Sequence, residues 1–461
     1  MNHALPTAIM GGGPVALAAA AQLAARNMPF VLLEQGTNVG AAVWSWKHVR
    51  MFSPWEFNID LAARELLLQA GWPEPDHAHM PTGEELVRDY LEPLSRLNSI
   101  RPFLKLNSKV TAVHRKGFDK MKTAGREQAP FIIEYVHEGR TQRLEAASVI
   151  DATGTWLTPN PIGASGNLAD GEALHADRIT YGIPDILGRD RERYAARNIV
   201  VIGSGHSAIQ ALTLLHELKL QMPETTIHWL LRKIDVSDAF GGGERDGLPA
   251  RGALGARAKQ YVRNGNVIVH TPVMIHRVSR DEAATLTLLG TKQGEDYAIE
   301  RVDEVIVATG ARPDFSFLRE LRYAADSAIE SVPELADLID PNIHSCGTVR
   351  PHGEAELRQP ERNFYIVGSK SYGRAPTFLL ATGYEQVRSV VAMLAGDEEA
   401  AREVRLRLPE TGVCSGAGSP EPDGGGSTCC TPTSSSYKPI AVTTAAASSC
   451  CGSTGKGSSC G

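Results

Sequence analysis

The stretch TAIMGGGPVALAAAAQLAARNMPFVLLE, residues 7–34, decides the fold. Its apolar start at 7–10 predicts a β-strand, three glycines follow at 11–13, and the alanine-rich run 15–26 predicts a helix. The segment FVLLE at 30–34 predicts the next strand. Strand, glycine turn, helix and strand in this order indicate a βαβ unit with parallel strands.

The same order of elements occurs a second time. NIVVIGSGHSAIQALTLL at 198–215 predicts a strand, a glycine turn and a helix, and TIHWLLRK at 226–233 predicts the following strand. Each copy ends, after alternating β-branched segments, on the tripeptide ATG, at 152–154 and 308–310. An internal repeat of this kind predicts two dinucleotide-binding folds in one chain.

The first glycine turn matches the pattern G-x-G-x-x-G/A, with Gly11, Gly13 and Ala16 at the three positions. It follows a strand, opens a helix and is followed by Glu34, 21 residues after Gly13, at the end of the next strand. In such a turn the backbone approaches a pyrophosphate, and the carboxylate accepts hydrogen bonds from ribose hydroxyls. The first copy therefore predicts a nucleotide with a free ribose, such as FAD.

The second turn repeats the three small residues and adds two polar ones at the helix N-terminus: Gly203, Gly205, Ala208, His206 and Ser207. Where the first copy has Glu34, the second has Arg232 and Lys233. A guanidinium can bind a 2′-phosphate with paired donors, whereas a carboxylate would repel it. The second copy therefore predicts NADPH; the alternative interpretation is that Arg232 and Lys233 form a solvated strand end.

Length and composition fit this organisation. The chain has 461 residues, with 42% hydrophobic and 22% charged residues, which is typical of a globular protein of more than one domain. A net charge of −6 offers no basic field to nucleic acid, and no long apolar segment predicts a membrane span. We expect a cytoplasmic protein with a small-molecule substrate and without nucleic-acid or membrane partners.

The predicted fold class is α/β, with two Rossmann-like domains that carry β-meanders. The first part of the FAD domain is expected at 1–165, with a helical insert at about 54–100, and the NADPH domain at 166–310. The FAD domain is expected to resume at 311–400, so that the NADPH domain interrupts it. The Gly-, Ser-, Thr- and Pro-rich segment 411–461 is expected to be a disordered tail.

With these motifs, the chain resembles the two-dinucleotide-binding flavoproteins, and within them the flavin-containing monooxygenases. The resemblance rests on the two glycine turns, Arg232, the ATG tripeptides and the segment PTGEELVRDYLE at 81–92. It implies that Trp44 lies by the flavin, that Val110 meets the adenine of FAD through its backbone, and that the remaining FAD contacts include Thr153, Gly154 and Gly368. Many relatives have Asp after that last glycine, whereas this chain has Ser369 and Lys370.

The resemblance also implies a chemistry. Flavin reduced by NADPH would form a C4a-hydroperoxyflavin and transfer one oxygen atom to a soft nucleophile such as nitrogen, sulfur or trivalent arsenic. Asn58 and Arg50 are the candidate catalytic residues, the alternative interpretations being a capping amide and a surface charge. The segment KHVRMFSPWEFNID at 47–60 and the cysteine-bearing tail also resemble flavoproteins encoded beside arsenic-resistance genes.

The cysteines leave alternatives open. Cys346 is the first cysteine of the chain, so the thiol pair of a disulfide reductase is missing from the body. A cluster of thiols in the C-terminal segment predicts binding of a thiophilic metalloid. The clustered residues are Cys429, Cys430, Cys450, Cys451 and Cys460. Besides a monooxygenase, the sequence therefore allows an NADPH-dependent reductase that uses these thiols, or a non-enzymatic metalloid-binding or redox-sensing flavoprotein.

Overall fold

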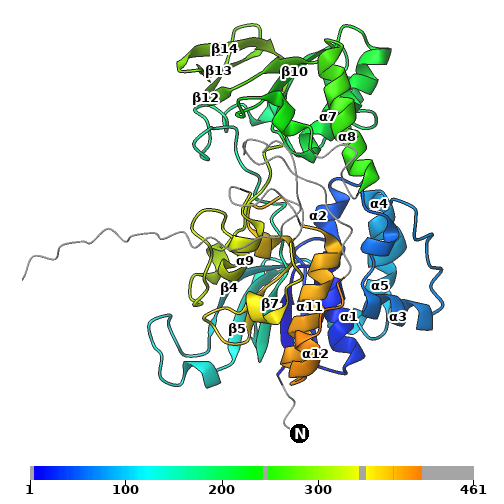
Figure 1. Ribbon diagram of the computed structural model, residues 1–461. Helices are drawn as coiled ribbons and strands as arrows, with labels where there is room; N and C mark the ends of the chain where they lie inside the picture. The colour runs from blue at the N-terminus through cyan, green and yellow to red at the C-terminus, as the bar shows by residue number, and fades with distance from the viewer. Residues whose placement is uncertain (1–4, 242–247, 342–348, 377, 407–461) are drawn as a thin grey trace, which may run out of the picture. The chain divides into compact units, whose positions relative to one another are not determined.

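Two five-stranded parallel sheets organise the part of the chain that the computed structural model describes, residues 5–241, 248–341, 349–376 and 378–406 (Figure 1). The first sheet has the strand order β16-β7-β1-β2-β3. Its strands are β1 (Thr7–Met10), β2 (Phe30–Leu33), β3 (Leu104–Lys105), β7 (Ser148–Asp151) and β16 (Phe364–Ile366). Because β16 pairs with β7, the chain returns to this sheet after it has built the second one.

Helices and a meander cover the first sheet. α1 (Pro14–Ala25) and α11 (Leu380–Leu394) lie side by side (Figure 1). An antiparallel meander of β4 (Ser108–Arg115), β5 (Phe131–His137) and β6 (Arg140–Ala146) contributes to the same hydrophobic core. Since both faces of the sheet are covered, β1 and β7 are buried over their whole length, which suits the apolar pairs Ala8–Ile9 and Val149–Ile150 at their centres.

The second sheet repeats this plan, with the strand order β11-β10-β9-β15-β8. Its strands are β8 (Ile179–Tyr181), β9 (Asn198–Ile202), β10 (Thr226–Leu230), β11 (Ile268–His270) and β15 (Glu304–Val307). The helix α7 (His206–Gln221) packs against β9 and β10, and α8 (Pro249–Arg263) packs against α7. Its meander consists of β12 (Val273–Arg280), β13 (Leu286–Lys292) and β14 (Glu295–Val302).

The segment after residue 54 is helical, as expected. It contains η1 (Trp55–Phe57), α3 (Leu61–Gln69), α4 (Gly83–Glu85), the π-helical η2 (Leu86–Leu91) and α5 (Glu92–Arg96). Thr82 begins the α4–α5 run with a capping box, because its hydroxyl accepts from the Glu85 amide while the Glu85 carboxylate accepts from the Thr82 amide. Leu86, Tyr90 and Leu94, which follow one another at intervals of four residues, are buried and face the core.

The remaining elements are short connecting helices. They are α2 (Ala41–Trp44), η3 (Arg101–Phe103), η4 (Arg126–Gln128), η5 (Ala176–Arg178), α6 (Arg191–Tyr194), η6 (Val236–Ala239), η8 (Ser316–Leu318), α9 (Pro333–Ile339), α10 (Glu354–Leu357), η9 (Gly368–Tyr372) and α12 (Glu398–Arg402). The predicted fold class, two Rossmann-like units with meanders, is confirmed. The residue limits of the domains stay predictions, and the tail expected at 411–461 lies outside the described residues.

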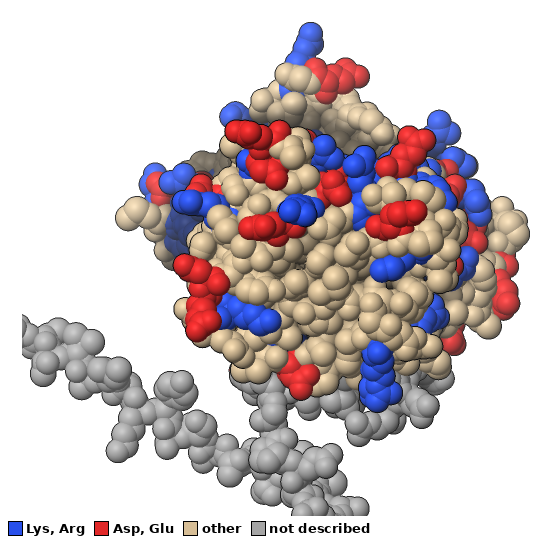
Figure 2. All heavy atoms as spheres, turned by 90° about the horizontal axis from the view of Figure 1, so that it is seen from above, with Lys and Arg blue, Asp and Glu red and all other residues tan. Residues whose placement is uncertain are grey.

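The surface and the helices bear on possible partners. Figure 2 shows a face on which Lys and Arg side chains are interspersed with Asp and Glu, so its described residues form no field of one sign. None of the helices in the described ranges has the length and apolar character that a bilayer crossing requires. The absence of nucleic-acid and membrane partners stays a prediction.

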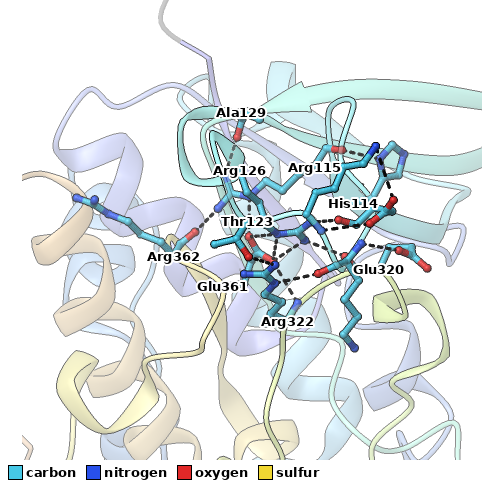
Figure 3. Close-up of polar contacts among 12 residues, drawn as sticks. His114, Arg115, Thr123, Arg126, Ala129, Glu320, Arg322, Glu361 and Arg362 are labelled. Atoms are coloured by element: carbon cyan, nitrogen blue, oxygen red, sulfur yellow. Dashed lines mark hydrogen bonds and ion pairs between the residues drawn. The ribbon is translucent and has the colours of Figure 1, made fainter. Parts of the chain in front are cut away.

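A buried ionic cluster joins distant parts of the first unit (Figure 3). The carboxylate of Glu361, just before β16, accepts hydrogen bonds from Arg115 Nε at 2.8 Å and from Arg126 Nη2 at 2.7 Å. All three side chains are about 2% exposed. Arg126 Nε also donates to Glu361, at 3.1 Å, and the Nη groups of the two arginines donate to the backbone carbonyls of Ala129, Arg362, Asp119 and Glu320. The cluster therefore fixes the loop between β4 and β5 to the segment that leads into β16.

The protonation of Glu361 follows from this environment. Burial opposes its ionisation, but the hydrogen bonds from Arg126 and Arg115 outweigh burial and lower its pKa below the ordinary value of 4.5. A lowered carboxyl pKa stabilises the folded state above the ordinary pKa, and this contribution is lost as pH falls through the lowered value.

We expect Glu361→Gln to destabilise the protein at pH 7 by about 3–5 kcal/mol, because it leaves two buried guanidinium groups without their counter-ion. The difference from the unsubstituted protein should shrink as pH falls from 4.5 through the lowered pKa of Glu361, because the carboxyl becomes protonated first in the unfolded and then in the folded chain. Urea unfolding between pH 7 and pH 3 measures it. Glu145→Gln, which removes the partner of exposed Lys116, is the control and should cost less than about 1 kcal/mol. An equal loss at every pH would contradict the assignment.

Candidate functional site

The first glycine turn packs its first glycine against the end of a neighbouring strand. Gly11 has φ +105°, and a Cβ on it would stand 2.7 Å from the carbonyl oxygen of Ala152, directly after β7. Gly13 begins α1 without a side-chain cap, and no atom of the described residues lies within 4 Å of where its Cβ would be. Ala16 is fully buried on the helix. The turn therefore leaves backbone N–H groups and open space where a pyrophosphate can approach.

Glu34 lies beside this turn. It follows β2 directly, is 7% exposed, and accepts a hydrogen bond from the Gly36 amide at 2.6 Å. A Cβ on Gly12 would be 2.7 Å from its Oε2, so the carboxylate is in contact with the turn backbone. Burial raises the pKa of Glu34, while hydrogen bonds from the Gly36 and Gly12 amides oppose the rise. Its position is that of a ribose-binding carboxylate.

The second turn has the same construction. Gly203 has φ +133°, and a Cβ on it would collide with the carbonyl oxygen of Ala308, directly after β15. Gly205 begins α7 without a side-chain cap, and within the described chain nothing lies within 4 Å of its Cβ position. The indole of Trp229, buried on the neighbouring strand β10, donates to the Gly203 carbonyl at 2.8 Å and so holds the turn against the sheet. A second pyrophosphate site is therefore available.

His206 and Ser207 are the first residues of α7, as predicted. The imidazole ring of His206 lies 5.7 Å from the ring of Phe52, a residue of the loop between α2 and η1. The guanidinium of Arg251, near the start of α8, lies 5.8 Å from the same Phe52 ring. Sequence reasoning missed Phe52 and Arg251, because nothing in their local sequence indicates that the loop of Phe52 and the start of α8 meet near the second turn.

The two basic residues after β10 differ in their surroundings. β10 ends at Leu230, two residues before Arg232. Arg232 is exposed, and its Nη1 donates to the Ala164 carbonyl at 3.3 Å. The Lys233 ammonium donates instead to the Asp238 carbonyl at 2.7 Å, in the following turn. Arg232 therefore presents the accessible cation at this strand end, and Lys233 supports the loop.

A buried ion pair lies at the end of β7, next to the first site. The Lys370 ammonium donates to Asp151 Oδ2 at 2.7 Å, to Thr153 Oγ1 at 3.1 Å and to the Asp314 carbonyl at 2.7 Å. Lys370 and Asp151 are both fully buried. Thr153 also donates to Asp151 Oδ1 at 2.7 Å. Lys370, which departs from the resembled family, is thus the counter-ion of the residue that ends β7.

Two predicted FAD glycines flank this pair. The Gly368 amide donates to Gln386 Oε1 at 2.7 Å, and Gly368 has φ +69°. A Cβ on Gly154 would be 3.4 Å from Ser369 Oγ. The first turn, Glu34, the ATG tripeptide and Gly368 all follow the carboxyl ends of parallel strands. The structure therefore gathers them at one edge of the first sheet, where ligands of such folds bind.

Two predicted FAD contacts lie outside this group of strand ends. Trp44 ends α2 with 37% of its surface exposed, and the Lys47 ammonium lies 4.9 Å from its ring. Val110 lies in the meander at a β-bulge of β4 and packs against the core. Their contacts with the flavin and the adenine stay predictions.

The side chains of the two candidate catalytic residues hydrogen-bond to nearby parts of the chain. Asn58 is 1% exposed; its Nδ2 donates to the carbonyls of Ser53 and Pro54 at 2.8 and 3.0 Å, and its Oδ1 accepts from Ser53 Oγ at 2.9 Å. Arg50 is exposed and donates to the Met80 carbonyl at 2.5 Å. These contacts are those of a capping amide and of a surface charge, the alternative interpretations. A catalytic role for either residue stays a prediction.

The predicted metalloid ligands cannot be placed. Cys429, Cys430, Cys450, Cys451 and Cys460 lie outside the described residues, as does Cys346. Within the described ranges, no group of three or more His, Cys, Asp or Glu side chains is arranged to hold a metal ion.

Comparison with known proteins gives one family and several similar folds. The profile of the pyridine nucleotide-disulphide oxidoreductases matches residues 8–347. No curated protein sequence matches the chain significantly. Bacillithiol disulfide reductase Bdr (YpdA) from Bacillus cereus aligns with a TM-score of 0.61 and 20% identity, over 85% of this chain and 100% of that chain.

Two further solved structures are, by title, a monooxygenase and an N-hydroxylase. The FAD-bound cadaverine monooxygenase DfoA of Erwinia amylovora has a TM-score of 0.60 and 14% identity, over 88% of this chain and 97% of its own. The ornithine N-hydroxylase KtzI of Kutzneria sp. 744 has a TM-score of 0.55 and 16% identity, over 85% of this chain and 100% of its own. At these identities the likenesses show the fold.

We expect Lys370→Met to destabilise the protein by about 3–5 kcal/mol, because it leaves the Asp151 carboxylate buried without its counter-ion. Adding Asp151→Asn should recover part of the loss, since the double variant buries no charge at this point. The midpoint of thermal unfolding and the flavin content of the purified protein report both effects. Lys116→Met, at an exposed ion pair, is the control. Unchanged stability of Lys370→Met would contradict the role given to this pair.

Proposed function

The chain belongs to the pyridine nucleotide-disulphide oxidoreductase family, and we propose that it is an FAD-containing, NADPH-dependent monooxygenase. Its substrate would be a small molecule with a soft nucleophilic atom, such as nitrogen, sulfur or trivalent arsenic. FAD and NADPH are in keeping with this family and with neighbours whose titles name FAD or NADP⁺. A cytoplasmic location and an arsenic-resistance role are further parts of the proposal.

The observation that carries the proposal is the contrast between two otherwise matching turns. Among the described residues, no side chain caps the helix N-terminus at either turn, and none fills the space at the second glycine. Beside the first turn stands the buried carboxylate of Glu34, which suits a free ribose and would repel a 2′-phosphate. Beyond β10 stands the exposed guanidinium of Arg232, which suits the 2′-phosphate of NADPH. The two sites therefore favour different dinucleotides.

The electron acceptor is argued from the cysteines. The region that matches the family, residues 8–347, contains one cysteine, Cys346, so it has no pair of thiols to form a disulfide within itself. FAD, when bound and reduced, supplies the chemistry of oxygen activation. The chain's own residues would bind and orient the two dinucleotides and exclude water. Likeness in fold to the cadaverine monooxygenase and the ornithine N-hydroxylase supports oxygen transfer to a nucleophile.

A reductase is the second candidate. The family name and the likeness in fold to a bacillithiol disulfide reductase favour it. In this case the thiols of the tail, from Cys429 to Cys460, would exchange electrons with the flavin or bind a thiophilic metalloid. A non-enzymatic metalloid-binding or redox-sensing flavoprotein is the third candidate and requires that NADPH is not oxidised.

NADPH oxidation with and without oxygen separates the three candidates. We expect the purified protein to retain FAD and, in air, to oxidise NADPH faster when a suitable amine, thioether or trivalent arsenical is added, with one oxygen atom incorporated from ¹⁸O₂. Oxidation without oxygen, coupled to thiol formation from a disulfide and abolished by Ser at the tail cysteines, would support the reductase instead. Absence of any NADPH oxidation would leave the non-enzymatic candidate.

Arg232→Ala tests the nucleotide assignment. We expect kcat/KM for NADPH to fall by about tenfold to a hundredfold, the effect of losing a charge-assisted hydrogen bond, while kcat/KM for NADH stays unchanged. The control is Arg189→Ala, which removes an exposed guanidinium of the same unit. An unchanged ratio of the two cofactors in Arg232→Ala would overturn the assignment.

A further inference from the structure

The segment that carries Arg232 continues beyond the parallel ladder. The pairing of β9 with β10 ends at Ile202 and Leu230, so residues 231–234 receive no support from β9. Their backbone is held instead by the segment 270–273, on the other side. The Leu231 amide donates to the His270 carbonyl at 3.0 Å, and the Val273 amide donates to the Leu231 carbonyl at 2.9 Å.

One side chain extends this support to the residues after Arg232. The hydroxyl of Thr271 donates to the Lys233 carbonyl, and the Ile234 carbonyl is 3.4 Å from the same oxygen. Leu231 is thus fixed by backbone hydrogen bonds on one side of Arg232, and Lys233 is fixed by a side-chain hydroxyl on the other. The backbone conformation at Arg232 depends on both anchors.

The supporting segment is itself held by its side chains. His270 Nε2 lies 2.8 Å from His228 Nδ1, and His270 Nδ1 lies 2.6 Å from the Tyr297 hydroxyl, so that β10, β11 and β14 are joined. Burial lowers the pKa of His270 to about 4, and the neighbouring His228 and Lys292 add to this effect. Burial also lowers the pKa of His228. Both imidazoles are therefore neutral at pH 7 and can share a hydrogen bond.

The tip of Arg232 is held from the same region. Its Nη1 donates to the Ala164 carbonyl at 3.3 Å, and the Ala164 amide donates to the Ile275 carbonyl of β12 at 3.0 Å. The chain between His270 and Ile275 therefore supports both the backbone around Arg232 and, through Ala164, its guanidinium.

We propose that Thr271 is a positioning residue for Arg232 and thereby determines the preference for a 2′-phosphorylated nucleotide without touching it. The proposal rests on the proposed function, because it takes Arg232 as the group that binds the 2′-phosphate. An arginine held in place before binding loses less conformational freedom when the ligand arrives, which strengthens binding. The benefit falls on ligands that carry the phosphate, so Thr271 should affect NADP⁺ and leave NAD⁺ unaffected.

Two substitutions isolate the hydroxyl. Thr271→Val keeps the branched shape and removes the donor, whereas Thr271→Ser keeps the donor and removes the methyl group. Binding of NADP⁺, NAD⁺ and adenosine 2′,5′-bisphosphate to the full-length protein is measured by isothermal titration calorimetry, without turnover. In Thr271→Val we expect NADP⁺ and the bisphosphate to bind about threefold to tenfold more weakly, the effect of one hydrogen bond. NAD⁺ should bind as before, and Thr271→Ser should behave like the unsubstituted protein.

Steady-state kinetics provides a second readout. KM for NADPH should rise in Thr271→Val while kcat at saturating NADPH stays within about twofold, because the 2′-phosphate contact serves binding and not the chemical step. Thermal unfolding shows whether the variant is folded.

Three results would overturn the proposal. They are an equal loss for NADP⁺ and NAD⁺ in Thr271→Val, no loss for either, and a loss in Thr271→Ser as large as in Thr271→Val. The proposed function is judged separately, on the unsubstituted protein and on Arg232→Ala. If the unsubstituted protein does not prefer NADP⁺ to NAD⁺, the NADPH assignment fails, and the role of Thr271 fails with it.

Discussion

The close contact between a glycine turn and a carbonyl oxygen at the end of the neighbouring strand sets the geometry of both nucleotide sites. Gly11 faces the carbonyl of Ala152, and Gly203 faces that of Ala308. Any side chain at either glycine would push the turn away from the sheet edge. Since the turn stays close, the helix after it starts at the carboxyl edge of the sheet with its N–H groups turned outward. The tripeptide ATG follows the parallel strand β7 in the first unit and β15 in the second, so it lies at the same edge.

Buried charges hold the interrupted unit together. The chain leaves the first sheet after β7 and returns with β16, so that the unit consists of two segments far apart in sequence. Lys370, from the returning segment, pairs with Asp151 at the end of β7, and Glu361 pairs with Arg115 and Arg126 beside the first meander. Desolvation makes such pairs costly to form, and breaking one side of a pair is costlier still. We therefore see them as fixing the register of the two segments more than as a source of net stability.

The two sites differ in the charge of the residue that follows the second strand of each repeat, Glu34 in the first and Arg232 in the second. A buried carboxylate lies beside the first turn and an exposed guanidinium lies beyond β10; under the proposed function these charges select different ribose groups on the same backbone frame. Selectivity of this kind depends on how firmly the charged group is held. Glu34 is held by the turn itself, through Gly36 and Gly12. Arg232 lies beyond the ladder, so its position depends on the chain between His270 and Ile275.

Local patterns determined the fold class and most of the nucleotide frame. Glycine spacing, alternating apolar runs and the residue at the next strand end depend on neighbours close in sequence. The glycines at the two turns and the places of Glu34 and Arg232 after their strands were therefore predictable, whereas their contacts with nucleotides stay predictions. Long-range contacts were not predictable. The sequence marked Lys370 as an unusual residue, but its pairing with Asp151 depends on the return of β16 to β7. Asn58 has an amide that suits either catalysis or capping, and the folded loop decided where its hydrogen bonds go. Thr271 belongs to no motif, and its contact with Lys233 arises because β10 and β11 end side by side.

The sequence by itself determined which residues repeat and which charges differ, because these are local properties. The tertiary structure decided which side chains meet, because that depends on how distant segments pack.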